Sequence, residues 1–268
     1  MAPYKNKRID MNALSACMLT GLALAPLLSA QALELNDDFQ LAITPTLISD
    51  YRANGLSQTL GDPAAQLAIT LNHVSGLYAG LWTSNVDFGH DSKARQEIEY
   101  FAGYFWQIND NISLDTFYTR YEFPRESGYN QSDIQTTLDL YGVLLGGKYV
   151  NNMKGPDYED DNGEFHEGKK DEDLSTVFIG YHTVLPAEIG LVLRYEYVDY
   201  KDDVFFSNSG KGRGDYYDWE VKLSRQLIGI DWALSYIDTD LSKAECTSFT
   251  GYDDVCGATL VASASKTF

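Results

Sequence analysis

Basic residues are few in this chain of 268 residues. It carries 20 Lys and Arg against 39 Asp and Glu, which gives a formal net charge of −19 at pH 7. A protein that binds nucleic acid needs a basic surface that displaces counterions, so this balance excludes a nucleic-acid partner. It also argues against docking on anionic lipid, but it is compatible with cationic solutes, divalent cations or solubility alone.

Long apolar runs and histidines are also scarce. Beyond residue 32 no stretch of 18 consecutive apolar residues occurs, so we expect no transmembrane helix there. None of the four histidines is expected in the middle of a strand beside a serine, and neither a nucleophile elbow nor a zinc-binding helix motif occurs. We therefore expect no enzymatic activity, no cofactor and no metal site.

The first 32 residues differ from the rest. Lys5, Lys7 and Arg8 precede an apolar stretch, and Ala30-Gln31-Ala32 supplies the small-x-small pattern that a signal peptidase cleaves. The alternative is a membrane anchor, which the borderline length and the missing stop-transfer flank disfavour. We predict a cleaved signal peptide over residues 1–32 and a mature domain over residues 33–268.

Cysteine is limited to three residues, and Cys17 would be lost with the signal peptide. Cys246 and Cys256 remain, in a protein that is expected to meet an oxidising compartment. Their spacing has no metal-ligand pattern and no histidine accompanies them. We predict a disulfide between them that closes a short loop.

Apolar and polar residues alternate with a period of two, as in strands with two different faces. In residues 216–225, for example, Tyr217, Trp219 and Val221 alternate with Asp218 and Glu220. We predict strands near residues 38–50, 63–73, 76–87, 96–107, 111–123, 135–145, 147–153, 173–183, 188–200, 214–225, 228–239 and 257–268.

The connections between these strands alternate in length. Long loops are expected at 51–62, 88–95, 124–134, 154–172, 201–213 and 240–256. Tight turns are expected at Val74-Ser75, Asn109-Asp110, Gly146-Gly147, Pro186 and Leu227. This is typical of an antiparallel transmembrane β-barrel with short periplasmic turns and long external loops. We predict an all-β barrel of about twelve strands, rather than a soluble sandwich, whose sealed core would not tolerate charged inner faces.

Several motifs also resemble those of a known family. They are residues 49–58, Gly61-Asp62-Pro63-Ala64, residues 76–86, residues 236–241 and the terminal Ser265-Lys266-Thr267-Phe268. Together they resemble the TorF family of porin-like outer-membrane proteins, which implies a porin without known substrate or catalytic residues. The chain departs from the family pattern at Ala53-Asn54, where a Phe-Arg pair is more usual, and in the longer, more acidic loop 154–172.

Charged residues on the predicted inner faces are the first candidate site. They are Glu97, Glu99, Asp115, Arg194, Glu196, Asp218, Glu220, Lys222 and Asp231. These side chains would line a water-filled passage that favours cations, as acidic rings do. Alternatively, ion pairs such as Arg194 with Glu196 and Lys222 with Glu220 would plug the barrel.

Polar residues at the expected external mouth are the second candidate site. They are Asp50, Tyr51, Arg52, Ser57, Gln58, Asn85 and Asp87. They would hold a solute or, as we prefer, order the loops. The acidic loop 154–172 has oxygen ligands that suit calcium, but its spacing departs from the EF-hand pattern, which favours a solvated loop.

The expected function is passive diffusion of small solutes or ions through the outer membrane of a Gram-negative bacterium. The alternative is a non-conducting barrel that binds partners through its acidic external loops. The expected partners are the lipid bilayer, the small solutes, and the barrel-assembly machinery through the strand that ends at Phe268, since such barrels commonly end on an aromatic residue.

Replacing Trp219 tests the face assignment. We expect Trp219→Arg to block assembly, because a charge on the lipid-facing side costs about 2–4 kcal/mol at mid-depth. The measurement is the yield of heat-modifiable, folded barrel on gels. A normal yield would show that the predicted strand register is wrong.

Overall fold

The computed structural model describes residues 32–89, 92–153, 158–159, 165–166 and 172–268. The predicted signal peptide and most of the acidic loop 154–172 lie outside these residues. Within the described residues, no helix is both long and apolar enough to cross a membrane.

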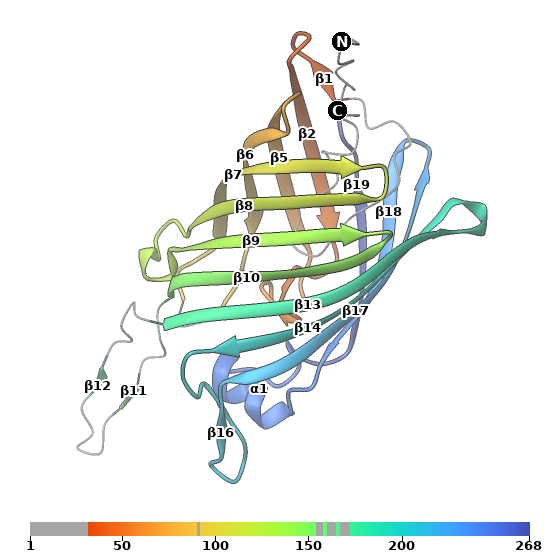
Figure 1. Ribbon diagram of the computed structural model, residues 1–268. Helices are drawn as coiled ribbons and strands as arrows, with labels where there is room; N and C mark the ends of the chain where they lie inside the picture. The colour runs from red at the N-terminus through yellow and green to blue at the C-terminus, as the bar shows by residue number, and fades with distance from the viewer. Residues whose placement is uncertain (1–31, 90–91, 154–157, 160–164, 167–171) are drawn as a thin grey trace.

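Twelve antiparallel strands form a closed barrel (Figure 1). They are β2 (Phe39–Ile48), β5 (Ala64–His73), β6 (Leu77–Asn85), β7 (Gln96–Asn109), β8 (Ile112–Glu122), β9 (Gln131–Leu140), β10 (Val143–Met153), β13 (Glu172–Leu185), β14 (Ile189–Tyr200), β17 (Asp215–Leu227), β18 (Ile230–Thr239) and β19 (Thr259–Ser265). Each strand pairs with its neighbours in the chain, and β19 pairs with β2 to close the ring. The predicted fold class is confirmed.

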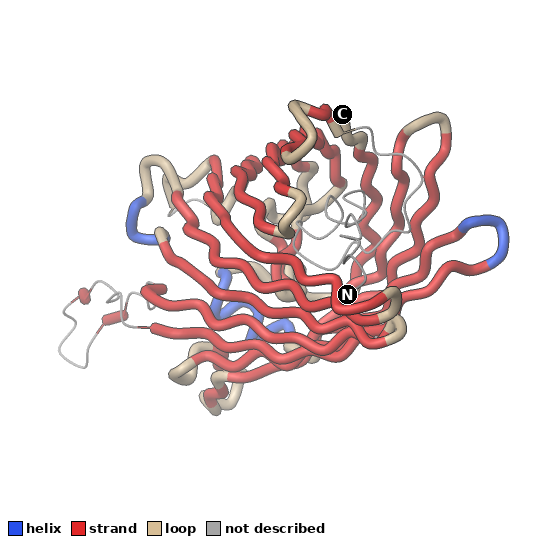
Figure 2. Tube along the Cα trace, turned by 45° about the horizontal axis from the view of Figure 1, so that its top comes forward, coloured by secondary structure: helices blue, strands red, loops and turns tan. Residues whose placement is uncertain are grey.

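Among the described residues, the short elements other than β1, which precedes β2, lie in the connections between the barrel strands, where Figure 2 draws the helical elements in blue. The short strands are β1 (Leu33–Glu34), β3 (Arg52–Ala53), β4 (Leu56–Ser57), β11 (Tyr158–Glu159), β12 (Phe165–His166), β15 (Phe205–Phe206) and β16 (Gly212–Arg213). The helical elements are α1 (Lys243–Thr250), η2 (Ser127–Tyr129) and η3 (Pro186–Glu188). The C-terminus and the short turns share one end of the barrel, and α1 and β16 lie at the other.

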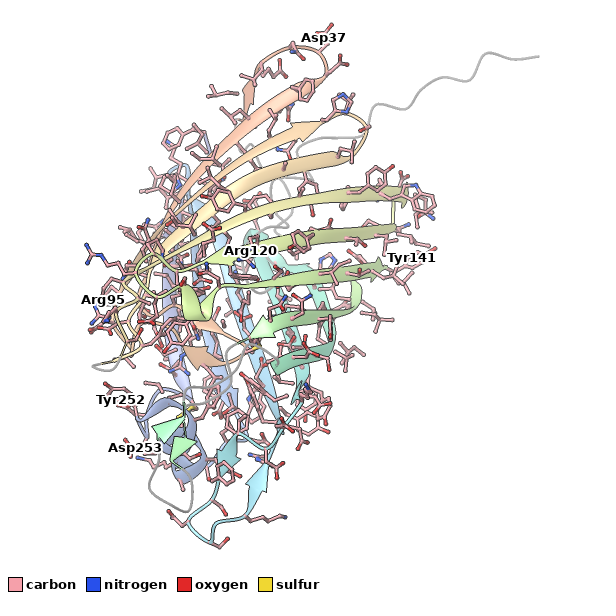
Figure 3. The ribbon with its side chains drawn as sticks, turned by 90° about the vertical axis from the view of Figure 1, so that its left-hand side faces the viewer. Asp37, Arg95, Arg120, Tyr141, Tyr252 and Asp253 are labelled. Carbon is pink, nitrogen blue, oxygen red and sulfur yellow. A yellow bond between two sulfur atoms is a disulfide. The ribbon has the colours of Figure 1, made fainter. Side chains whose placement is uncertain are left out.

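The predicted alternation of long and short connections holds along the chain. Figure 3 labels Tyr141 in one of the short turns, and Tyr252 and Asp253 in the long connection between β18 and β19 at the opposite end. The short turns therefore correspond to the predicted periplasmic side, and the long loops to the predicted external side.

The two faces of each strand differ as the alternation predicts. Trp219 faces outward on β17 and stacks on Tyr195 of β14, with ring centroids 6.4 Å apart. Its neighbours Asp218 and Glu220 face inward and are buried. Large apolar side chains on the outward faces, such as Val177 and Ile179, are more than half exposed, so much of the outer wall is apolar.

Glycines on the inner face lie under aromatic rings of the neighbouring strand. A Cβ added at Gly80 would clash with the Phe101 ring, and one at Gly103 would clash with the Tyr78 ring. Gly146 lies under Phe178 in the same way. These rings fold flat along the wall, which they can do only because glycine has no side chain there.

The prediction of a turn at Gly146-Gly147 is wrong. Both glycines lie inside β10, and the turn is at Tyr141-Gly142, where both residues have positive φ (57° and 86°). The Asp139 side chain accepts a hydrogen bond from the Gly142 amide (2.9 Å) and so stabilises this turn. Consequently β9 begins at residue 131 rather than 135, and β10 begins at 143 rather than 147.

Helix α1 lies in the connection 240–256, for which only a loop was predicted. The pattern Ser242-x-x-Glu245 forms a capping box, with each side chain bonding the backbone N–H of the other residue. Gly251 ends the helix in the left-handed conformation. Arg213 of β16 forms an ion pair with Glu245 (Nε to Oε1, 2.9 Å) and so ties two external loops together.

The stability of α1 should depend on pH through Glu245. Partial burial raises the pKa of Glu245, but hydrogen bonds from Ser242 and the charge of Arg213 outweigh it and hold the pKa below its usual value. Because the pKa of Glu245 is lower in the folded than in the unfolded protein, its ionised form stabilises the folded state at any pH above the unfolded value of about 4.3. This stabilisation is lost as the pH falls through the lower pKa of the folded state. We expect amide hydrogen exchange in residues 243–250 to accelerate at about pH 3 relative to pH 7, after correction for intrinsic rates.

Glu245→Gln is the matched control for this measurement, because it keeps the shape of the side chain but cannot titrate. It should show faster exchange at pH 7 and no further acid-dependent step. An acid-dependent step of equal size in this variant would show that another group is responsible.

Candidate functional site

The loop between β2 and β5 folds into the barrel as a small hairpin. Strands β3 and β4 pair with each other, and Asn54-Gly55 forms the turn with positive φ at both residues (47° and 79°). Lys148 of β10 donates to the Asn54 side chain (3.0 Å). The hairpin follows directly after β2, and β10 lies on the opposite side of the barrel from β2, because the same number of strands separates them in either direction. The hairpin therefore reaches across the lumen to the opposite wall.

The hairpin tip also contacts the wall formed by β17 and β18. The Tyr216 hydroxyl donates to the Asn54 carbonyl (2.8 Å). Gly55 lies so close to Asp218 and Thr239 that a Cβ at this position would clash with the Thr239 side chain. Glycine is therefore needed at the tip both for its positive φ and for this close approach.

A buried polar cluster holds the hairpin in its conformation. Arg52 and Asp50 form an ion pair (2.6 Å), with their side chains 4% and 6% exposed. The Ser57 hydroxyl donates to the other Asp50 oxygen (2.5 Å), and Arg52 also donates to the carbonyls of Gly55 (2.9 Å) and Gly257 (3.0 Å). Of the predicted mouth residues, Asp50, Arg52 and Ser57 thus bond to the loops themselves, as the loop-ordering interpretation expects.

The remaining mouth residues are distributed around the same end. Asn85 accepts from the Ala65 amide (2.8 Å), and its amide nitrogen donates to the Pro63 carbonyl (3.2 Å). Asp87 accepts from the Gly89 amide (2.9 Å), and Gln58 donates to the Leu56 carbonyl (2.9 Å).

Tyr51, the last of the mouth residues, is buried and interacts with the carboxylate of Glu97. Burial is the main cause that raises the pKa of Tyr51 well above its usual value, and the nearby Glu97 and Glu99 raise it further.

The predicted disulfide between Cys246 and Cys256 is confirmed. The backbone next to it holds the hairpin. The Val255 carbonyl accepts from the Ser57 amide (2.9 Å), and the Cys256 carbonyl accepts from the Thr239 hydroxyl (2.7 Å). The Arg52 bond to Gly257 completes this set. The disulfide-closed loop therefore fastens the hairpin to the barrel wall.

Two apolar clusters pack inside the barrel around the hairpin. The first contains Leu56, Val150, Leu174, Val198, Tyr200, Val204, Phe205, Tyr216, Leu241, Cys246, Val255 and Cys256. The second contains Tyr51, Ala64, Ala68, Tyr78, Trp82, Val86, Ala94, Phe101, Phe105 and Phe123. Each cluster combines strand residues with loop residues, so the long loops fold inward and narrow the lumen at the external end.

The predicted lumen residues all belong to the inward set of the strand register. They are Glu97, Glu99, Asp115, Arg194, Glu196, Asp218, Glu220, Lys222 and Asp231. Arg194 forms ion pairs with Glu196 (2.7 Å) and Asp218 (2.9 Å) and lies opposite Glu220 in the register. Lys222 has no ion pair within the described part of the chain, so the expected pairing with Glu220 is not seen.

Among the described strand residues, four further inward-facing side chains that carry a carboxylate, an amine or an imidazole escaped the sequence analysis. They are Asp133, Asp139, Lys148 and His182. Asp139 and His182 contact each other (2.7 Å). Asp133 was placed in a loop and Lys148 in a short, uncertain strand, because the turn between β9 and β10 was misplaced. The Asn54-Gly55 pair is a strong hairpin pattern that would have predicted the inward loop.

A cavity of about 340 Å³ opens beside the hairpin, and we call it the vestibule. Its polar lining includes Glu97, Asp133 and Lys148 from the wall, and Gln58 and Asp87 from the loops. Aromatic residues, including Phe88, Phe123, Tyr129, Tyr200 and Phe249, form much of the remainder. No group of three metal-binding side chains was found among the described residues.

Solved structures of porins resemble this barrel. The NanC porin covers 84% of this chain and 97% of its own, with 10% sequence identity and a TM-score of 0.50. The KdgM porin covers 85% and 99%, with 12% identity and a TM-score of 0.47. An outer-membrane channel from Pseudomonas putida F1 covers 90% and 100%, with 12% identity and a TM-score of 0.45.

At this identity the likeness to the NanC porin shows a shared fold and no more. No curated protein matches the chain. The comparisons do not confirm the name TorF that the motifs suggested; instead a family model described as a bacterial protein of unknown function matches residues 34–268. Because that model covers nearly all of the domain predicted after the signal peptide, the chain belongs to the Gcw_chp family of bacterial proteins of unknown function.

Proposed function

We propose that this protein is a porin-like channel in the outer membrane of a Gram-negative bacterium, through which small solutes or ions diffuse passively, with a preference for cations. The observation that carries the proposal is the charge of the inner face. Among the described strand side chains, the inward acidic residues are Glu97, Glu99, Asp115, Asp133, Asp139, Glu196, Asp218, Glu220 and Asp231, whereas the inward basic residues are Lys148, Arg194 and Lys222.

An excess of carboxylates within a barrel attracts cations and repels anions, because the surrounding protein and lipid screen charge poorly. A barrel of twelve strands is also too wide for wall side chains alone to fill. In this chain the hairpin and the two apolar clusters occupy part of that space. The solutes that pass are therefore small.

Assembly in the outer membrane is supported by the closing seam between β19 and β2. Backbone N–H and C=O of Phe268 exchange hydrogen bonds with Ile43 of β2 (both 3.0 Å), so the terminal aromatic residue extends the closing seam. The apolar outer surface suits a lipid bilayer. We propose that the barrel-assembly machinery recognises the strand that leads to Phe268.

A second candidate function is a non-conducting barrel that binds partners through its external loops. The packing of the hairpin against Lys148 and Tyr216 favours this alternative, because it places backbone across the lumen. The Arg194 network also occupies part of the inner face with paired charges.

Conductance of the refolded protein in a planar bilayer under a KCl gradient distinguishes the two functions. We expect discrete steps and a reversal potential on the cation-selective side. Glu220→Gln should shift this potential toward zero without reducing the yield of folded barrel, because it removes one inward carboxylate. Silent, folded protein would favour the non-conducting barrel, and an unchanged potential in the variant would exclude Glu220 from the passage.

The hairpin should limit the conductance. Arg52→Ala removes a buried ion pair and leaves Asp50 unpaired, which costs about 3–5 kcal/mol in buried sites. We expect the hairpin to loosen and the unit conductance to rise above that of the natural protein. Arg125→Ala is the matched control, since Arg125 is exposed and lies outside the hairpin, in the connection between β8 and β9. Equal conductance in all three proteins would show that the hairpin does not constrict the passage.

A further inference from the structure

Two arginines share an open groove on the outside of the barrel, at the end where the long loops lie, and we call it the rim groove. Its volume is about 540 Å³, and its lining includes Arg95, Arg125, Thr83, Asn85 and Gln96. Figure 3 labels Arg95 at the opposite end of the barrel from Tyr141, which lies in a short turn. Among the described residues no carboxylate lines this groove. Its local charge is therefore the reverse of the chain's net charge of −19, and an anion is attracted only locally.

Arg95 is held in place but keeps hydrogen-bond donors for a ligand. Its Nη1 donates to the carbonyls of Ser92 (3.0 Å) and Ala94 (2.6 Å). An Asp87 oxygen lies 3.6 Å from the same nitrogen, beyond hydrogen-bond distance, and both side chains are about half exposed, so this ion pair is weak. Within the described part of the chain, Nε and Nη2 make no hydrogen bond. These two nitrogens form an edge that suits two oxygens of one phosphate.

Arg125 occupies a turn position at which glycine is the usual residue. Pro124 and Arg125 are the central residues of a turn that closes when the Glu126 amide donates to the Phe123 carbonyl (3.0 Å). Arg125 has a positive φ of 72°, which favours glycine or asparagine. Its side chain is exposed and has no ion pair in the part of the chain that the structure describes. No contact among these residues offsets the backbone strain, which points to a partner outside the chain.

The floor of the rim groove consists of outward-facing polar side chains that are already bonded. Gln96 donates to the Thr83 hydroxyl (3.0 Å), which in turn donates to the Glu97 carbonyl (2.7 Å). Asn85 is likewise bonded to backbone groups of the neighbouring segment. The floor is therefore fixed in place, and the recognition of a charged ligand falls to the two arginines.

The outward face next to the groove is apolar. In the strand register Thr83 lies between Leu67 of β5 and Ile98 of β7, and the next outward residues toward the middle of the barrel are Leu81 and Tyr100. Successive outward residues are about 7 Å apart along a strand, so the two arginines lie close to a wall that suits acyl chains. A tyrosine at this level is typical of a membrane interface.

We infer that the rim groove binds the phosphate group of a phosphorylated lipid in the outer leaflet of the membrane. Arg95 and Arg125 donate to the phosphate oxygens, and the acyl chains lie against the outward face of β5, β6 and β7. A free phosphate ion would use the arginines but not the wall, which favours the lipid as the source of the phosphate. This inference goes beyond the proposed channel and rests on it only for the location in the outer membrane.

Native mass spectrometry of the refolded, full mature protein in detergent tests the inference by lipid titration. The probe is lipid A with both phosphates, and dephosphorylated lipid A, which has the same acyl chains, is the matched control. We expect the phosphorylated lipid to bind about tenfold more tightly, and equimolar inorganic phosphate not to displace it. Equal binding of the two lipids would overturn the inference. Displacement by inorganic phosphate would also overturn it, because the site would then recognise the ion and not the lipid.

Variants locate the binding. The double variant Arg95→Gln, Arg125→Gln should lower the affinity for phosphorylated lipid A by about tenfold or more, to that of the dephosphorylated lipid, and each single change should lower it less. Arg225→Gln is the matched control, since Arg225 is exposed and faces outward near the opposite end of the barrel, beside Trp232. Unchanged affinity in the double variant would overturn the assignment. Should the double variant fail to fold, the single variants and the three probes on the natural protein still decide.

Bilayer recordings on the same preparations keep this inference apart from the proposed channel. Binding of the phosphorylated lipid by protein that carries no current would leave the groove site standing and refute the channel. Current together with equal binding of the two lipids would leave the channel standing and refute the site. Recovery of the protein in the soluble fraction of cells would refute both.

Discussion

Closure of the backbone hydrogen-bond ladder is the constraint on which the rest of this structure depends. In the membrane location that we propose, the outer surface of the sheet meets no water that could bond a free edge, so the first and last strands must pair. Here β19 and the residues after it pair with β2, although Pro45 of β2 has no N–H to contribute. Closure forces every second side chain inward and thereby creates an interior.

That interior determines what the long loops do. The wall of the barrel cannot fill the space by itself, and its inward carboxylates need partners or water. The hairpin of residues 52–57 enters from one side and bonds to Lys148 on the other. Its position depends on the Asp50–Arg52 pair and on the disulfide-closed loop, so separate stretches of the chain hold the hairpin in place.

Local rules explain where prediction succeeded and where it failed. Alternation placed Trp219 outward and Asp218 and Glu220 inward, because the period of a strand is a local property. The Gly146-Gly147 pair suggested a turn, because glycines are common in turns and this too is a local pattern. In the structure Gly146 instead leaves room for the Phe178 ring of β13, a contact that the local sequence does not indicate. The misplaced turn then concealed Asp133 and Lys148, two of the residues that line the vestibule.

By itself the sequence determined the barrel, the approximate strand count, the face of most strand residues and the disulfide, because alternation, turn composition and cysteine spacing act over short distances. Only the tertiary structure decided that the first long loop lies inside the barrel, that Arg194 is shared between Glu196 and Asp218, and that aromatic residues from several loops surround one cavity. These contacts join residues far apart in the chain, and their geometry follows from closure and packing, which no local pattern encodes.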